Sequence, residues 1–178
     1  MTAFRPKKAP EPLTAATLER LALAYVGRYA TSRVKLERYL ARKIAERGWE
    51  GATPPDPHAL AARLAGLGYV DDAALAAARG RALARRGLGA RRLGVALDGL
   101  GIAGEDRAEA LEEARRHAWE TALRYAERRR LGPFAPGPVD PAARRRGVAA
   151  MLRAGHAPDH VRAIMESHPG TVPQRDEN

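Results

Sequence analysis

The sequence predicts an all-α protein, an elongated array of three tandem three-helix repeats. Apolar residues make up 45% of the chain and are mostly alanine and leucine, which favour helix over strand. No segment alternates apolar and polar residues with period two, so no strand is expected. Glycines that end helical patterns recur about 53 residues apart, at Gly48, Gly101 and Gly155, and such regular spacing indicates an internal repeat.

Residues 1–16 are rich in proline and basic side chains, and we expect them to form a disordered arm in which Arg5, Lys7 and Lys8 add attraction for phosphate. The first repeat is predicted to span residues 17–70. Its first helix begins near Thr17, Thr31 or Ser32 caps the second, and Gly48 ends that second helix. Asp56 followed by Pro57 is typical of the start of a third helix, whose inward residues are Leu60, Leu64 and Leu67.

The second repeat is predicted to span residues 71–117. Asp71 can cap its first helix with a side-chain acceptor, and Gly87-Leu88-Gly89 joins that helix to the next. Gly101 can adopt the left-handed conformation that ends a helix. The third helix begins near Glu105 and is either fused to the following helix or bent near His117.

The third repeat is predicted to span residues 118–168. Residues 131–139 contain three prolines and two glycines and are expected to form a loop. Asp140-Pro141 again indicates a helix start, and a last helix begins near Pro158. Residues 169–178 are expected to be a disordered tail. The repeat is imperfect because Gly147 stands where the other two copies have leucine, and a compact bundle with accidental periodicity is the alternative.

The most distinctive stretch of the chain runs from Leu67 to Ile102. Its residues resemble the RecX family, the regulators of the RecA recombinase, in order and spacing. The matching residues are Leu67-Gly68-Tyr69-Val70-Asp71-Asp72, Gly87-x-Gly89, Arg92, Leu97 and Gly101-Ile102. This copy departs from the family at Arg79 and Gly80, where an aromatic and an aliphatic residue are usual, and at Ala90, where proline is common.

The resemblance extends from about Leu18 to Met165 and implies three tandem three-helix units. It also implies that the protein binds RecA filaments and restrains ATP hydrolysis and strand exchange, acting in recombination and DNA repair as part of the SOS response. No catalytic activity and no cofactor are expected. A monomer in the cytoplasm is the expected form.

The charge balance is strongly basic, with 31 Lys plus Arg against 21 Asp plus Glu and a formal net charge of +10. Such a balance favours an anionic partner, either DNA or an acidic protein surface. Exposed arginine runs can also be solvated faces that only maintain solubility. The candidate binding residues are Arg79, Arg81, Arg85, Arg86, Arg91, Arg92, Arg128, Arg129, Arg130, Arg144, Arg145 and Arg146.

Other chemistries have weaker signals. The chain has no cysteine, which excludes disulfides and thiolate metal sites. It has no phosphate-binding loop or nucleophile motif. His156 and His160 are four residues apart but have no matching acidic ligand, so exposed or capping histidines are expected and no metal site. No apolar run is long enough to span a membrane.

Two other functions remain open. Two helices joined by a glycine-containing turn can resemble a helix-turn-helix. The first alternative is therefore a stand-alone DNA-binding protein without sequence preference. Aromatic residues, at 5%, are too few to predict base stacking, and Tyr39, Tyr69, Trp49 and Trp119 are expected to be core or interface anchors. An enzyme would need a catalytic residue constellation that the sequence does not display.

Overall fold

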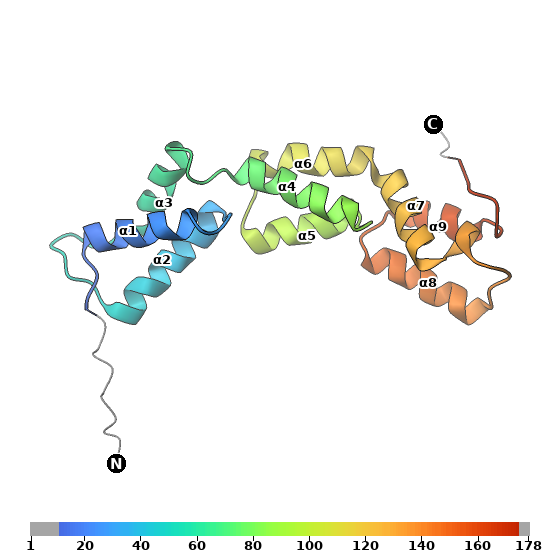
Figure 1. Cartoon of the computed structure of the whole chain (residues 1–178), viewed down its shortest axis with the longest axis horizontal. Coiled ribbons are helices and arrows are strands. Elements are labelled where there is room, and N and C mark those ends of the chain that lie inside the picture. The colour runs from blue at the N-terminus through green and yellow to red at the C-terminus, as the bar shows by residue number, and fades with distance from the viewer. Residues whose placement is uncertain (1–10, 175–178) are drawn as a thin grey trace, which may run out of the picture. The chain divides into compact units, whose positions relative to one another are not determined.

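The computed structural model describes residues 11–174, and all regular secondary structure in this range is helical (Figure 1). The predicted all-α class is therefore confirmed. An isolated parallel bridge joins Leu13 and Trp49. The described residues form the helices α1 (Ala15–Val26), α2 (Arg33–Arg47), α3 (Pro57–Gly66), α4 (Asp72–Arg85), α5 (Ala90–Leu100), α6 (Glu105–Arg116), α7 (Ala118–Arg129), α8 (Pro141–Arg153) and α9 (Pro158–Glu166), with a 3-10 helix η1 (Gly132–Phe134) before α8.

The chain divides into two compact units, residues 1–71 and 72–178. Buried side chains of the first unit form one cluster among α1, α2 and α3. Those of the second unit form two clusters, one among α4, α5 and α6 and the other among α7, α8 and α9. Each group of three helices thus has its own small core. The predicted limits of the three repeats stay a prediction.

The first helix begins two residues before the predicted start. The Thr14 Oγ1 accepts the backbone N–H of Thr17 at 3.3 Å, and the Thr17 Oγ1 accepts that of Thr14 at 2.7 Å. This reciprocal capping box satisfies donors that the helix itself leaves unpaired. Leu13, just before the cap, is fully buried in the core of α1–α3. The predicted disordered arm was therefore wrong for its last residues, and Arg5, Lys7 and Lys8 lie outside the described range.

Other helix ends of the first unit follow the sequence signals. Ser32 accepts the N–H of Lys35 at 3.2 Å and caps α2, while Gly48 ends it with φ +80°. Asp56 accepts the N–H of Ala59 at 2.9 Å and caps α3. Leu67, however, is 61% exposed rather than inward, because it lies one residue past the end of α3.

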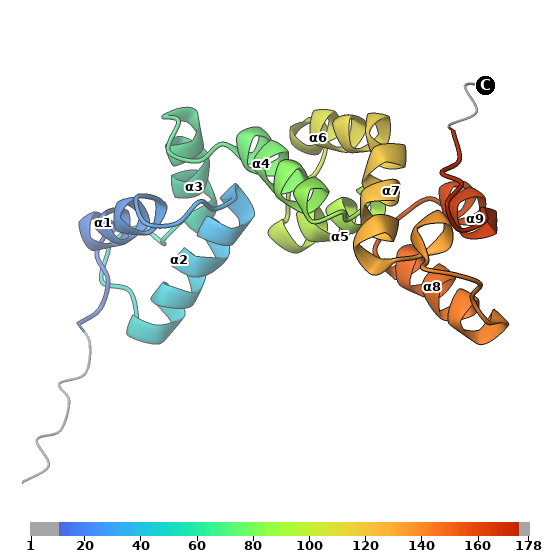
Figure 2. The same ribbon diagram turned by 45° about the vertical axis from the view of Figure 1, so that its right-hand side comes forward.

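The second unit begins with α4, α5 and α6 (Figure 2). Their core includes Leu83, Leu93 and Leu97. α4 begins directly after Asp71, and α5 ends at Gly101, which is left-handed with φ +72°. α6 starts at Glu105 as expected. The helical pattern is interrupted at His117, which separates α6 from α7, so the bend is found rather than the fused helix that was the other alternative.

The last three helices pack around Trp119, Met151 and Ile164. Asp140 caps α8 by accepting the N–H groups of Ala142 and Ala143. Gly147 departs from the repeat pattern for a steric reason. A Cβ there would lie 2.8 Å from the Met165 Cε, so the absence of a side chain at this position lets Met165 pack against α8 without shifting.

Residues 131–139 are not a plain loop, since η1 forms a short turn within them. The predicted tail is attached at its start, because the Gly170 N–H donates to the Pro133 carbonyl at 2.8 Å. Among the helices of residues 11–174, none combines the length and the apolar character that crossing a membrane requires.

Candidate interaction surface

The twelve arginines predicted as binding residues all lie in the second unit, and all are exposed. Six belong to the α4–α5 hairpin, and we call them the α4–α5 arginines: Arg79, Arg81, Arg85, Arg86, Arg91 and Arg92. The others lie at the end of α7 or on α8: Arg128, Arg129, Arg130, Arg144, Arg145 and Arg146.

Four carboxylates of this unit form ion pairs with arginines other than the α4–α5 arginines. Within residues 11–174, none of the α4–α5 arginines forms an ion pair, so their charges are available to a partner. An exposed guanidinium offers a planar set of donors to a carboxylate or a phosphate. The observed pairs of the unit are Asp98–Arg107, Glu112–Arg115, Glu113–Arg116 and Asp159–Arg162.

The end of α4 is fixed against α7. Gly87 approaches the Tyr125 backbone so closely that a Cβ at position 87 would lie 3.2 Å from it. The positive φ of Gly87, +71°, also favours glycine at this position. Arg124 donates from Nη1 to the Ala84 carbonyl at 3.0 Å, which satisfies one of the last carbonyls of α4. The pair Arg85 and Arg86 therefore lies beside the middle of α7.

The start of α5 is fixed against the end of α8. The Gly89 N–H donates to the Ala154 carbonyl at 2.9 Å, and the Arg91 N–H donates to the Gly155 carbonyl at 3.3 Å. Two glycines make this approach possible, because a Cβ on Gly89 would lie 2.3 Å from the Gly155 oxygen. The side chains of Arg91 and Arg92 stay exposed while their backbone is held by α8.

Two further arginines belong to this region. Arg124 holds the end of α4, and Arg153 is exposed in the last turn of α8, two residues before Gly155. The sequence did not single them out because neither has an arginine beside it. Their placement comes only from the contacts of α7 and α8 with the α4–α5 turn.

The arginines at the end of α7 differ in their surroundings. The Arg129 guanidinium carbon lies 5.7 Å from the Tyr125 ring centroid, which holds part of this side chain against α7. Arg130 adopts a left-handed conformation with φ +52° and ends the helix, a position that usually carries glycine.

The arginines of α8 are partly structural. The Arg144 Nε donates to the Met165 carbonyl at 3.0 Å and so contacts the end of α9. The pKa of Asp140 lies below its usual value, because its carboxylate accepts the N–H groups of Ala143 and Ala142, and Arg146 adds electrostatic attraction. Arg144 and Arg145 border a shallow groove of about 560 Å³ between α8 and α9.

His156 was expected to be exposed or capping, and this expectation was wrong, since the residue is only 2% exposed. The pKa of His156 is lowered from 6.5 to about 4, mainly by burial and also by the proximity of His160. A hydrogen bond with the Gly87 backbone opposes these effects. The ring lies 5.2 Å from that of Tyr125, so His156 fills the junction between the α4–α5 turn and α7–α9.

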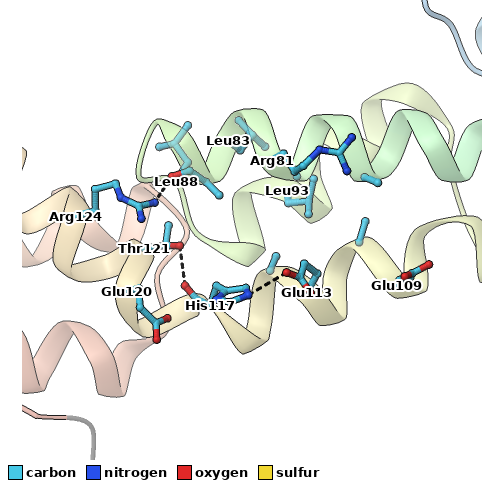
Figure 3. A pocket seen from close by; sticks show the side chains of 15 residues that line it. Arg81, Leu83, Leu88, Leu93, Glu109, Glu113, His117, Glu120, Thr121 and Arg124 are labelled. Carbon is cyan, nitrogen blue, oxygen red and sulfur yellow. Dashed lines mark hydrogen bonds and ion pairs between the residues drawn. The ribbon is translucent and has the colours of Figure 1, made fainter.

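A cavity of about 490 Å³ lies between α4 and the α6–α7 segment (Figure 3). Leu83, Leu88 and Leu93 form its apolar part, while carboxylates line the α6–α7 wall and Arg81 projects from the α4 side. Gly80 contributes to the space because it carries no side chain. Within the described part of the chain no group of three His, Asp or Glu side chains could hold a metal ion.

The sequence and the fold were compared with those of known proteins. No model of a known protein family matches the sequence. Over 173 residues the chain is 30% identical to the protein described as "Regulatory protein RecX" from Myxococcus xanthus (strain DK1622), covering 93% of this chain and 92% of that protein. The crystal structure of RecX from Lactobacillus salivarius is similar in fold, with a TM-score of 0.60 and 16% identity over 85% of this chain and 94% of that one.

Proposed function

The chain belongs to the RecX family of regulatory proteins, and from this premise we propose that it binds filaments of the RecA recombinase and slows their ATP hydrolysis and strand exchange. The proposed role is regulatory rather than catalytic. In this proposal the protein acts in the cytoplasm as a monomer, contacts both recombinase and DNA, and modulates recombination and DNA repair.

The observation that supports this proposal most directly is the set of α4–α5 arginines. All six are exposed, and across residues 11–174 none of them is neutralised by an ion pair. An acidic protein surface and a phosphate backbone are the two partners that a filament of recombinase on DNA offers to such side chains.

The second support is the fixed position of this hairpin. Arg124 ties the end of α4 to α7, and the Gly89 and Arg91 backbone N–H groups tie the start of α5 to the end of α8. Cations held on one rigid surface lose less conformational freedom on binding than cations on a mobile loop. Many weak contacts to neighbouring protomers can then add as avidity.

We further propose that the three groups of helices are copies of one repeat, with limits near residues 17–70, 71–117 and 118–168. The separate cores of the three groups support this, as do the glycines with positive φ at the ends of α2, α5 and α8: Gly48, Gly101 and Gly155.

The test uses the DNA-stimulated ATPase of the cognate RecA. We expect the wild-type chain to slow hydrolysis at substoichiometric amounts, and Arg85→Glu/Arg86→Glu to weaken this inhibition at least tenfold, because two fixed cations become anions. Arg115→Glu/Arg116→Glu is the matched control. That pair also lies at the last turn of a helix, and its partners are Glu112 and Glu113.

Helix content measured by circular dichroism should be the same in all three proteins. Full hydrolysis in the presence of equimolar wild-type chain would contradict the proposed function. If Arg85→Glu/Arg86→Glu inhibits the ATPase as strongly as Arg115→Glu/Arg116→Glu does, the α4–α5 arginines are not the binding surface.

The alternative is a stand-alone DNA-binding protein that needs no recombinase. A helix-turn-helix would use the first turn of α5 to read bases. That turn is held by the Ala154 and Gly155 carbonyls, and α5 carries no Asn or Gln. Binding through α5 would therefore be electrostatic, without sequence preference.

A further inference from the structure

Three tyrosines of the first unit form a cluster that is not apparent in the sequence. The rings of Tyr25 and Tyr39 are stacked, with centroids 4.1 Å apart and an interplanar angle of 15°. The Tyr29 ring lies 5.3 Å from that of Tyr25, tilted by 51°. We call these three residues the tyrosine cluster.

Local structure explains how the rings meet. Tyr25 lies in the last turn of α1, and the Tyr29 N–H donates to its carbonyl at 3.0 Å, so the chain makes one more turn after the helix ends. Residues four apart in such a turn lie on the same side. Tyr39 comes from α2, which packs against α1.

The members of the cluster are not equally buried. Tyr25 and Tyr39 pack partly against the core of α1–α3, and this alone explains their contact. Tyr29 is not part of that packing and is 53% exposed. Its ring is tilted against that of Tyr25 and about half of the side chain is exposed to solvent, so it contributes little to the core.

Two basic side chains lie near the Tyr39 ring. The Arg42 guanidinium carbon and the Lys43 Nζ lie 5.8 Å and 5.9 Å from the Tyr39 ring centroid. Glu46 neutralises part of this charge, with its carboxylate 3.7 Å from Arg42 and 2.6 Å from Lys43. Residues 28–46 are nevertheless basic, with Glu37 and Glu46 as their acidic residues against six basic ones: Arg28, Arg33, Lys35, Arg38, Arg42 and Lys43.

We propose that the tyrosine cluster is a binding site for single-stranded nucleic acid. A base stacks on the exposed Tyr29 ring, and Arg28 and Arg42 hold the neighbouring phosphates. Aromatic rings bordered by basic side chains are the usual means of binding single strands without sequence preference. A duplex fits poorly, because its bases are already stacked inside the helix.

This site belongs to the first unit, whereas the α4–α5 arginines belong to the second. It adds a base-stacking contact to the electrostatic DNA contact of the proposed function. No base stacking was expected from the sequence, because aromatic residues make up only 5% of the chain. The assembly of the tyrosine cluster depends on the packing of α1 against α2.

The first test measures the affinity of the full chain for a labelled 20-nucleotide oligothymidylate by fluorescence anisotropy. We expect Tyr29→Ala to weaken binding about tenfold, in the range found for loss of one base–aromatic contact. Tyr29→Phe should bind like the wild type, since it keeps the ring. Tyr69→Ala is the matched control, because Tyr69 is 56% exposed and lies in the same unit outside the cluster.

The second test identifies the stacked residue directly. An oligonucleotide that carries 5-iododeoxyuridine is irradiated in complex with the wild-type chain, and tryptic peptides are analysed by mass spectrometry. We expect the adduct on the peptide Tyr29–Arg33, which trypsin releases by cutting after Arg28 and Arg33. The peptide that contains Tyr69 should stay unmodified.

The proposal is overturned if the chain does not bind the oligonucleotide, if Tyr29→Ala weakens binding less than twofold, or if Tyr69→Ala weakens it equally. An equal loss on a duplex of the same length, or an adduct on the Tyr69 peptide instead, also overturns it. None of these measurements contains recombinase, so their outcome is separate from that of the ATPase test.

Discussion

His156 is the residue whose burial has the clearest thermodynamic consequence. Its ring lies between the α4–α5 turn and α7–α9, and no hydrogen-bond partner within the described residues reaches its Nε2. A neutral ring is tolerated there, whereas a protonated ring would place a charge beside Tyr125 and His160. Folding of the second unit therefore favours the neutral form.

This gives a prediction about acid stability. The pKa of His156 is lowered from 6.5 to about 4, so between these values the unfolded chain binds a proton that the folded chain does not. Stability should fall as the pH drops from 6.5 towards 4, by up to about 3 kcal/mol from this residue. Urea unfolding at pH 7 and pH 4.5 measures the loss.

The comparison that isolates His156 uses two substitutions. His156→Gln should lose less stability than the wild type over the same pH interval, although it is less stable at pH 7. His168→Gln, which changes an exposed histidine, should lose as much as the wild type. An identical pH dependence in all three proteins would show that His156 does not carry the effect.

At the scale of a helix, α4 contains a residue of low helix propensity in its interior. Gly80 lies in the helix interior, where glycine is less favourable than alanine by roughly 1 kcal/mol. A Cβ there would lie 3.3 Å from the Leu93 Cδ2, the flexible end of a side chain that borders the cavity between α4 and α6–α7. The helix can therefore accept the methyl group with a small shift of Leu93.

We predict that Gly80→Ala stabilises the protein by about 0.5 to 1 kcal/mol, because the helical backbone loses less entropy on folding. Urea unfolding provides the measurement. Gly99→Ala in α5 is the control, since a Cβ there meets nothing within 4 Å and reports helix propensity alone. Destabilisation by Gly80→Ala together with stabilisation by Gly99→Ala would show that Leu93 cannot move.

For the whole molecule, the formal charge of +10 predicts binding to DNA that weakens steeply with salt. Arg85→Gln/Arg86→Gln should reduce the slope of log affinity against log salt by about 2 on duplex DNA if both side chains contact phosphates. Arg115→Gln/Arg116→Gln should leave the slope close to that of the wild type, because these arginines are already paired.

Anisotropy titrations with two duplexes of unrelated sequence provide this measurement. Equal affinity for both is expected, since α5 offers no base-reading amides. A tenfold preference for one duplex would favour specific recognition over the electrostatic alternative. An unchanged slope in the Arg85/Arg86 variant would place the phosphate contacts elsewhere in the chain.

The sequence by itself determined the helical class and most helix ends, because these depend on interactions within one turn. Asp56 and Asp140 cap the helices that they precede, and Gly48 and Gly101 end helices with a positive φ. The early start at Thr14 was missed because its capping partner is a threonine rather than Glu or Gln.

Only the tertiary structure decided which side chains meet. The burial of His156, the attachment of the α4–α5 turn to α7 and α8, and the assembly of Tyr25, Tyr29 and Tyr39 all join residues of different helices. Each depends on close approaches, such as that of Gly89 to Gly155, which the spacing of residues along one helix cannot reveal. Helical periodicity determines which side of a helix is apolar, whereas packing between helices determines its neighbours.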